Sequence, residues 1–423
     1  MISIEACLAE HSVAPAETIA RRVRELLCAS GSVHEGQFLD LSLDQALQNE
    51  LRHVRVADMS SSATDGVCMS TAIHVHRLYD EEAAEETADD DEDSNIAFSM
   101  WTLPSLEFDG LWESLIYDED VKPKLLRYVS AAMRFSELGV DSRVISWNRV
   151  VLLHGPPGTG KTSLCKGLAH KLAIRMSHRY TQGHLIEVNA HSLFSKWFSE
   201  SGKMVLGMFT KIREILEDGD SFVCVLIDEV ESLTAARQAA VSGSEPSDAV
   251  RVVNALLTQL DGLRRYQNAL VLTTSNLTAA IDPAFVDRAD IKQFVGQPGV
   301  RARYQILASC LIELGRAGVL ATCGLFLSFE DLKPVLPTPP PTFAVVQRLE
   351  VNNPSELGPK HSMMLYAIAE SCDGLSGRAL RKLPFIAHAL YAPDADGTDV
   401  ETFLCALARG VQHERDARTA LHA

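Results

Sequence analysis

The feature that most constrains this chain is a glycine-rich run between an apolar segment and an amphipathic one. Residues 155–162 are GPPGTGKT, which matches the pattern GxxxxGK[ST] in full. The apolar segment Val150–Leu153 predicts a strand before the run, and the spacing of Leu164, Leu168 and Leu172 predicts a helix after it. In such a unit, backbone N–H groups surround phosphate at a helix N-terminus. The run therefore predicts an α/β fold with a nucleotide site.

Each part of this run has an expected role in holding ATP. Lys161 is expected to reach the β- and γ-phosphates, and the Thr162 hydroxyl is expected to ligate Mg²⁺. ATP and Mg²⁺ are therefore the predicted cofactors. The residues predicted to surround the nucleotide form one continuous stretch: Gly155, Pro156, Pro157, Gly158, Thr159, Gly160, Lys161, Thr162 and Ser163.

A second apolar segment ends in two acids. Residues 222–227 are FVCVLI and predict a buried central strand, which is followed by Asp228 and Glu229. Asp228 is expected to hold Mg²⁺, and Glu229 is expected to polarise the attacking water. Signalling GTPases place a Gln or Thr in the water-orienting role and carry a guanine-selecting motif, which we do not find. The pair of acids therefore favours ATP hydrolysis.

Three further polar residues suit an ATP-hydrolysing site, and each also has an ordinary structural interpretation. Asn276 follows a third apolar segment and either contacts the attacking water or the γ-phosphate, or caps the strand or starts a turn. Arg288 lies among acids and is either a surface ion pair or an arginine finger for a neighbouring subunit, worth about 10³–10⁵ in rate. Arg378 begins a C-terminal helix and either reaches the γ-phosphate or lies on a solvated turn. A finger acting on a neighbour requires an oligomer.

A short segment combines two adjacent aromatics with a lysine. Lys196, Trp197 and Phe198 precede a stretch that contains Ser and Gly, which predicts an exposed loop. Two neighbouring aromatics cannot share one helix face. Either one of them is buried and the other exposed without a role, or the loop grips an extended chain in the pore of a ring. Residues 240–248, rich in Ser and Gly, are the candidate for a second pore loop.

The acidic charge of the chain is concentrated in one segment. Of the net charge of −17, the run Asp80–Asp93 contributes −10, with ten carboxylates in fourteen residues. Such a run repels itself and predicts a disordered linker. An acidic chain is unsuited to coating nucleic acid or an anionic membrane, although the remaining −7 weakens this argument for the body. Nine dispersed cysteines without a CxxC pair, and no signal peptide, predict an intracellular chain with reduced thiols.

These elements resemble, in their order and spacing, those of an AAA+ ATPase. The chain is further similar to the pachytene checkpoint protein 2 family, also called thyroid receptor-interacting protein 13. The similarity is dense from about Trp101 to Gln297 and returns near the C-terminus. The runs that carry it are Gly155–Lys166, Leu193–Lys203, Val225–Arg237, Glu245–Asn254, Phe285–Gln293 and Gly374–Leu390. The acidic linker and a proline-rich stretch near Pro334–Pro359 depart from the family pattern.

The residue pattern, together with the resemblance, divides the chain into parts. We expect an N-terminal α+β recognition domain at 1–79, a disordered linker at 80–98, and an α/β ATPase subdomain at 99–299 with a five-stranded parallel sheet. A small helical lid is expected at 300–423, with a proline-rich surface insertion at 334–359.

The resemblance also implies a function. Such proteins are hexameric, and they open closed HORMA-domain clients, which a HORMA-type adaptor presents, by pulling them through the pore. The expected roles are spindle-checkpoint silencing and meiotic chromosome-axis control, in nucleus and cytoplasm. Neither sequence-specific nucleic-acid binding nor a membrane is expected.

Two other classes of function compete with this one. A clamp loader or helicase loader of the same superfamily would show a basic face or an added winged-helix domain, whereas residues 301–423 predict a helical lid. A scaffold that uses ATP only as a structural ligand would be expected to lack Glu229 or Arg288, and both are present.

Overall fold

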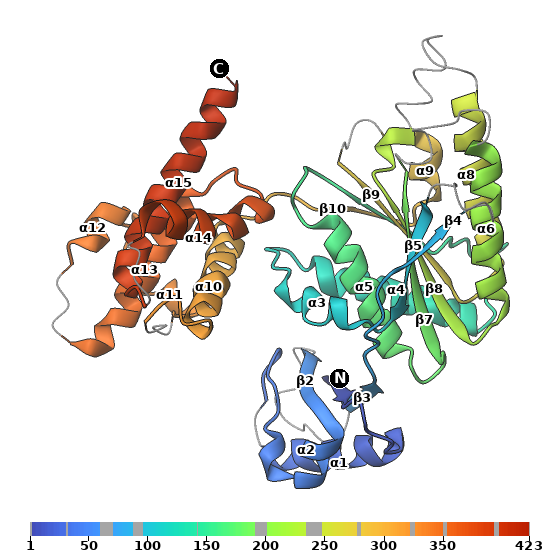
Figure 1. The fold of residues 1–423 in the computed structure, drawn as a ribbon, viewed down its shortest axis with the longest axis horizontal. Coiled ribbons are helices and arrows are strands. Elements are labelled where there is room, and N and C mark those ends of the chain that lie inside the picture. The colour runs from blue at the N-terminus through green and yellow to red at the C-terminus, as the bar shows by residue number, and fades with distance from the viewer. Residues whose placement is uncertain are drawn as a thin grey trace. The chain divides into compact units, whose positions relative to one another are not determined.

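The computed structural model describes most of the chain in two compact units. The described residues are 2–30, 33–59, 71–87, 96–141, 143–190, 201–233, 248–276, 281–321, 326–349, 353–392 and 397–422. The first unit contains residues 1–115, 122–154 and 161–294, and the second contains 116–121, 155–160 and 295–423. Figure 1 traces both. Each unit is described by itself.

A small mixed sheet begins the first unit. Its strands lie in the order β2-β1-β3, and β1 is antiparallel to β2 and parallel to β3. Helix α1 buries Ile19, Val23 and Leu27 against this sheet, as its spacing predicts. The elements are β1 (Ile2–Leu8), α1 (Ala16–Ala29), η1 (Leu41–Leu43), α2 (Gln45–Glu50), β2 (Leu51–Met59) and β3 (Thr71–His76).

A seven-stranded sheet forms the centre of the first unit. The strand order is β10-β6-β9-β8-β7-β5-β4. The first five strands are parallel, which confirms the predicted five-stranded parallel sheet, and β5 and β4 extend it antiparallel. Their bounds are β4 (Ala84–Thr87), β5 (Ile96–Leu103), β6 (Val150–His154), β7 (Gln182–Asn189), β8 (Ser221–Asp228), β9 (Ala269–Ser275) and β10 (Ile291–Phe294).

The expected linker at 80–98 is wrong in part. Residues 84–87 form β4, and β5 begins at Ile96. Backbone pairing with β5 compensates for charge repulsion in so short a segment, and charged side chains are common on edge strands because they discourage further pairing. Residues 88–95 of the expected linker lie outside the described part.

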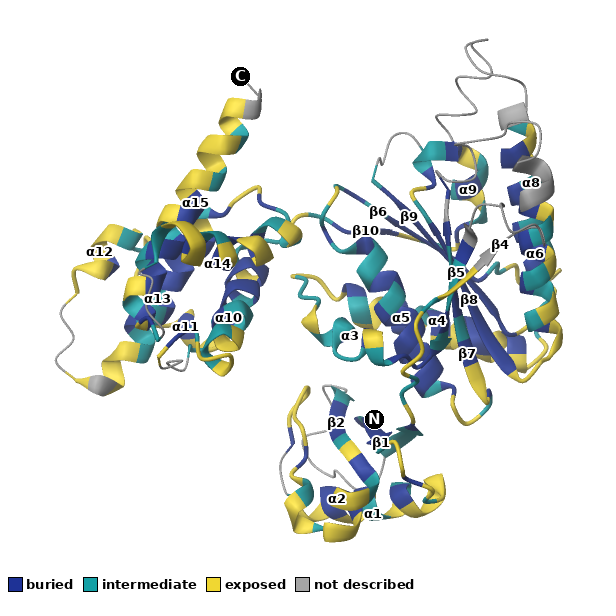
Figure 2. Ribbon diagram, in the orientation of Figure 1, coloured by how far each residue is buried: buried dark blue, intermediate teal, exposed yellow. Residues whose placement is uncertain are grey.

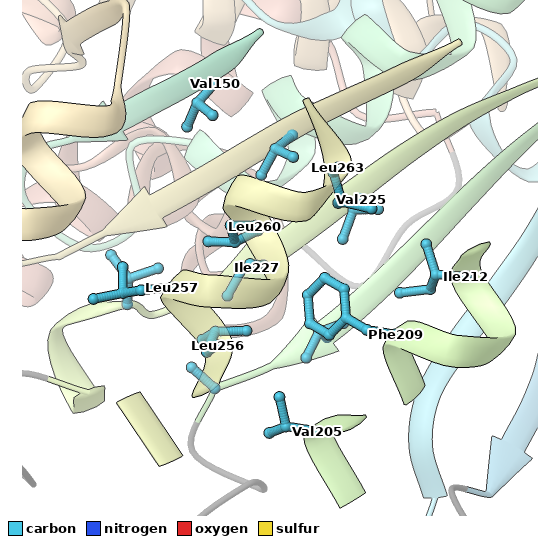
Figure 3. Close-up of a cluster of buried hydrophobic side chains, with 14 of the residues drawn as sticks. Val150, Val205, Phe209, Ile212, Val225, Ile227, Leu256, Leu257, Leu260 and Leu263 are labelled. Atoms are coloured by element: carbon cyan, nitrogen blue, oxygen red, sulfur yellow. The ribbon is translucent and has the colours of Figure 1, made fainter. Parts of the chain in front are cut away.

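Helices cover both faces of the large sheet. Helix α5 (Lys161–Arg175) packs on one face, and α6 (Ser201–Glu217) and α8 (Asp248–Leu263) pack on the other (Figure 1). Figure 3 shows the second layer, where Phe209 of α6 and Leu256 of α8 meet Val225 of β8. Strand β8 is buried along nearly its whole length, as a central parallel strand must be. The unit also contains η2 (Leu106–Phe108), α3 (Leu111–Ser114), α4 (Val121–Glu137) and α9 (Pro283–Arg288).

The second unit is a helical lid around its own core, as predicted. Figure 2 shows buried positions on the facing sides of its main helices. The expected proline-rich surface insertion is wrong in part, because the short helix α12 lies within it and Val346 of that helix is fully buried in the lid core. The elements are α10 (Val300–Arg316), α11 (Phe329–Leu332), α12 (Phe343–Gln347), η3 (Pro354–Glu356), α13 (Leu357–Ser371), α14 (Gly377–Tyr391) and α15 (Val400–His422).

Two general expectations also meet the structure. Within the described residues, no helix has the length and apolar character needed to cross a membrane. Among the cysteines that the structure describes, six are free thiols and Cys28 is disulfide-bonded, so the expectation of uniformly reduced thiols is wrong at Cys28.

Candidate functional site

The glycine-rich run connects β6 to α5 in a backbone shape that requires glycine. Gly155, Gly158 and Gly160 have φ angles of 144°, 76° and 87°, which place them outside the range that other residues readily adopt. Thr159 stabilises the turn by donating from Oγ1 to the Pro156 carbonyl at 3.1 Å. Lys161 begins α5 and is 5% exposed. The strand, loop and helix therefore follow one another as the sequence predicts.

Positive charge from this helix start reaches the end of β6. His154, the last residue of β6, has its pKa lowered by burial and by the charge of Lys161. A neutral imidazole therefore adjoins the loop at neutral pH. The main cationic group here is Lys161, which suits a site for phosphate anions.

Thr162 and Asp228 come together as expected. Thr162 Oγ1 lies 3.1 Å from each carboxylate oxygen of Asp228. Hydroxyl and carboxylate oxygens are the hard donors that Mg²⁺ prefers, so this donor set fits the ion, with Thr162 and Asp228 as the residues that would hold it. Elsewhere in the described part of the chain, no cluster of three or more His, Cys, Asp or Glu side chains could hold a metal.

Glu229 leaves strand β8 in an unusual backbone conformation. Its φ angle is 59°, in the left-handed region that is uncommon for residues other than glycine. Its N–H donates to Thr274 Oγ1 at 3.2 Å, and the N–H of Val230 donates to the Thr274 carbonyl at 3.0 Å. The Glu229 residue is exposed while Asp228 is half-buried, so the two adjacent acids have different environments.

Asn276 lies directly after β9, the neighbour of β8. Its backbone N–H donates to Glu231 Oε1 at 3.0 Å, and the residue is half-buried. Because β8 and β9 are parallel and adjacent, Asn276 and the two acids lie at the carboxyl ends of neighbouring strands, on the same side of the sheet. The structure thus places Asn276 at the carboxyl end of β9, beside the end of β8 that carries Asp228.

Arg288 ends helix α9 with its guanidinium held inside its own chain. It forms a bidentate ion pair with Asp261 of α8, at 2.9 Å from Nε to Oδ1 and 2.7 Å from Nη2 to Oδ2, and Nη1 donates to the Ala284 carbonyl at 2.8 Å. The hydrogen bond to Asp261 raises the pKa of Arg288. Both interpretations from the sequence therefore remain, because the ion pair exists and a partner subunit is not part of the structure.

In the second unit, the lid helix α14 begins beside the glycine-rich loop. The backbone N–H of Arg378 donates to the Gly158 carbonyl at 3.1 Å, and a Cβ at Gly158 would come within 2.8 Å of Ser376 Oγ. Ser376 caps the helix through the N–H of Ala379. Arg378 itself is exposed. The lid thus contacts the loop through backbone, and its Arg378 side chain is accessible.

The proposed pore loops fall outside the described residues. Lys196, Trp197 and Phe198 belong to the segment 191–200, and most of the second candidate loop belongs to 234–247. Helix α6 begins directly after the first segment, at Ser201. Both pore-loop assignments therefore remain predictions.

Three residues at the site were not predicted from the sequence. Thr274 and Glu231 hold the backbone around Glu229 and Asn276, and Asp261 holds Arg288. The only sequence signal for Thr274 is a pair of threonines at the end of an otherwise apolar strand. No local pattern marks Asp261, which lies 27 residues before Arg288 in the chain.

Comparisons with known proteins agree with this geometry. Residues 151–297 match the model of the ATPase family associated with various cellular activities (AAA), and residues 299–415 match the TRIP13-like, AAA+ ATPase lid C-terminal domain. The chain is 49% identical to the pachytene checkpoint protein 2 homolog of Oryza sativa subsp. indica, over 98% of this chain and 87% of that protein. It is 46% identical to the pachytene checkpoint protein 2 homolog of Homo sapiens, over 97% of this chain and 93% of that protein.

Solved structures show the same likeness. The structure of C. elegans PCH-2 has a TM-score of 0.76 and 35% identity, covering 98% of this chain and 99% of that one. The Trip13-containing E. coli MS115-1 HORMA:CdnC:Trip13 complex has a TM-score of 0.50 and 18% identity, covering 73% of this chain and 94% of that one. At 18% identity the second likeness shows the fold alone.

Proposed function

This chain belongs to the pachytene checkpoint protein 2 family of AAA ATPases, and we propose that it is a hexameric remodeller that opens HORMA-domain proteins. The observation that carries the proposal is similarity over nearly the whole chain, the N-terminal sheet included, to homologs of that name and to C. elegans PCH-2. A solved relative of similar fold is a Trip13 in a complex with a HORMA protein. As an AAA ATPase, the chain hydrolyses ATP.

The residues of the site divide the hydrolysis between them. Lys161 and the loop N–H groups bind the phosphates, and exposed Glu229 accepts a proton from the attacking water. Asn276 orients that water from the neighbouring strand. Bound Mg²⁺, held by Thr162 and Asp228, would neutralise charge on the phosphate oxygens.

Two arginines connect hydrolysis to other parts of the assembly. When the ring forms, the Arg288 guanidinium leaves Asp261 and contacts the γ-phosphate bound in a neighbouring subunit. There it would stabilise the negative charge of the phosphoryl group in the transition state. Arg378 senses the γ-phosphate from the lid, whose helix α14 starts beside Gly158. Hydrolysis at one interface then changes both the lid and the neighbour.

The pulling step uses the loop before α6. Lys196, Trp197 and Phe198 project into the central pore and grip an extended client chain by packing that tolerates many sequences. Exposed adjacent aromatics are otherwise unfavourable on a surface. The N-terminal sheet receives the client together with a HORMA-type adaptor. The proposed setting is the nucleus and cytoplasm, in spindle-checkpoint silencing and meiotic chromosome-axis control, without direct sequence-specific nucleic-acid binding.

A substrate trap tests this proposal. Glu229→Gln should bind ATP, hydrolyse it poorly and retain HORMA-domain proteins in a pull-down, and mass spectrometry identifies what is bound. Trp197→Ala should keep ATP binding and lose conversion of the closed HORMA form to the open form. Normal conversion by Trp197→Ala would remove the pore loop from the mechanism. A steep salt dependence of DNA binding would instead support a nucleic-acid loader.

A further inference from the structure

Thr274 contacts both acids of the site through one hydroxyl group. Its Oγ1 donates to Asp228 Oδ1 and accepts the backbone N–H of Glu229 at 3.2 Å. A hydroxyl has one proton and two lone pairs, so it can make both bonds at once. Thr274 is 2% exposed, which leaves these protein groups, rather than bulk water, to satisfy it.

The backbone of Thr274 extends the same contact by one residue. Its carbonyl accepts the N–H of Val230 at 3.0 Å, so the last residue of β8 and the two residues that follow it are all held by one residue of β9. Glu229 lies in the middle with a φ angle of 59°. A non-glycine residue keeps this conformation only when its surroundings impose it, and the bond from its N–H to Thr274 Oγ1 is such a constraint.

The two acids need different positions to do different work. Asp228 points toward Thr162, at 3.1 Å, whereas Glu229 is exposed. Strand β8 ends at Asp228, and the left-handed conformation of Glu229 turns the chain out of the strand directly after it. A hydroxyl that binds Asp228 on one side and the Glu229 amide on the other fixes both directions together.

We propose that Thr274 is a positioning residue for ATP hydrolysis. Its hydroxyl holds the Asp228 carboxylate beside Thr162 and keeps the Glu229 backbone in the turn that presents its carboxylate to water. The inference rests on the proposed roles of Asp228 and Glu229, and not on the identity of the client. Thr274 itself does not touch the reacting atoms.

The preceding threonine provides a matched control. Thr273 lies in the same strand, is 1% exposed, and donates from Oγ1 to the Val151 carbonyl of β6 at 3.0 Å. That bond joins two strands and touches neither acid. Thr273→Val and Thr274→Val therefore remove the same chemical group from equally buried places, and only the second removes it from the acids.

The experiment compares Thr274→Val, Thr274→Ser and Thr273→Val in the full-length protein with saturating Mg²⁺. Misplacing a catalytic group by about 1 Å can cost about 100-fold in rate. We expect Thr274→Val to lower kcat by about 10- to 100-fold, with the Kd of a fluorescent ATP analogue changed less than about threefold. Thr274→Ser keeps the hydroxyl and should restore most of kcat, and Thr273→Val should hydrolyse ATP like the wild type.

A second readout does not depend on activity. In nucleotide-free protein, hydrogen–deuterium exchange should quicken in peptides that contain Glu229 in Thr274→Val and stay unchanged in Thr273→Val. A Thr274→Val protein with wild-type kcat overturns the inference, and so do equal losses in the two valine variants or a Thr274→Ser protein as slow as Thr274→Val. Glu229→Gln in the same assay distinguishes failure of this inference from failure of the proposed function. Normal hydrolysis by Glu229→Gln would refute the proposed site itself.

Discussion

Four charged side chains join the N-terminal sheet to the ATPase body, and removing one of them should destabilise the first unit strongly. Glu5 of β1 and Arg55 of β2 meet Glu113 of α3 and Lys171 of α5, with acids and bases alternating around a ring. Lys171 Nζ lies 2.5 Å from Glu5 and 2.6 Å from Glu113, and Arg55 lies 2.8 Å from Glu5 and 3.0 Å from Glu113. We call these residues the charge quartet.

The magnitude follows from burial. The side chains of Glu5 and Lys171 are 1% and 2% exposed, so their charges are compensated by the other members of the quartet and not by solvent. Breaking a buried pair by removing one partner costs about 3–5 kcal/mol, because the remaining charge stays buried. Lys171→Met should therefore lower the free energy of unfolding by about that amount. The double variant Glu5→Leu/Lys171→Met should recover much of the loss, since replacing both charges by apolar groups is often neutral.

The pKa of Glu5 predicts how the effect of Lys171→Met on stability depends on pH. Burial raises this pKa, but Lys171 and Arg55 lower it more, and it falls to about 2. A depressed pKa adds stability above the unfolded value of 4.5 that is lost as pH falls toward 2. In Lys171→Met the pKa of Glu5 rises, so this acid-dependent loss of stability should begin at a higher pH.

Urea unfolding across a pH series, combined with a double-mutant cycle, measures both effects. Arg143→Met is the matched control, because Arg143 pairs with Asp141 at the surface, with 89% and 46% of the side chains exposed. Exposed pairs contribute about 0–1 kcal/mol, so this control should barely change unfolding. If Lys171→Met costs no more than Arg143→Met, or if the Glu5 and Lys171 effects are simply additive, the quartet does not join the sheet to the body as argued.

Two further predictions concern Arg288 and acid sensitivity. Asp261→Asn weakens the bidentate pair with Arg288, so Arg288→Ala should lower ATP hydrolysis in the assembled protein more than Asp261→Asn does; equal rates in kcat measurements would favour a purely structural ion pair. Burial lowers the pKa of His76 to about 4 and that of His170 to about 3. The unfolded chain then binds more protons below pH 6.5, so thermal stability should fall as pH drops from 6.5 toward 4, and His76→Phe should flatten this dependence in a melting series.

The sequence predicted those parts of the site that depend on local pattern. The run 155–162 and the acids after β8 carry their roles in adjacent residues, because phosphate binding needs a turn and a helix start that neighbours alone can form. Thr274 and Asp261 could not be found this way, because their partners belong to other elements and meet them only after strand order and helix packing are set. The charge quartet has the same origin.

The acidic run shows the opposite error. Its composition indicates charge repulsion, but composition does not show that residues 84–87 can pair through their backbone with β5, which begins at Ile96. Residues 84–87 satisfy their backbone groups on β5 although Glu85 and Glu86 are charged. Net charge therefore predicted the local structure of residues 84–87 wrongly.

Helix α5 connects the nucleotide end of the body to the N-terminal sheet. Lys161 and Thr162 lie at its start, and Lys171, about 15 Å further along at 1.5 Å per residue, is part of the charge quartet. Nearly every residue between them is buried, so the helix is held on all sides and must move, if it moves, as one body. Two members of the quartet, Glu5 and Arg55, belong to strands of the N-terminal sheet. A displacement of the phosphate end of α5 would therefore reach the charge quartet without a hinge in this helix.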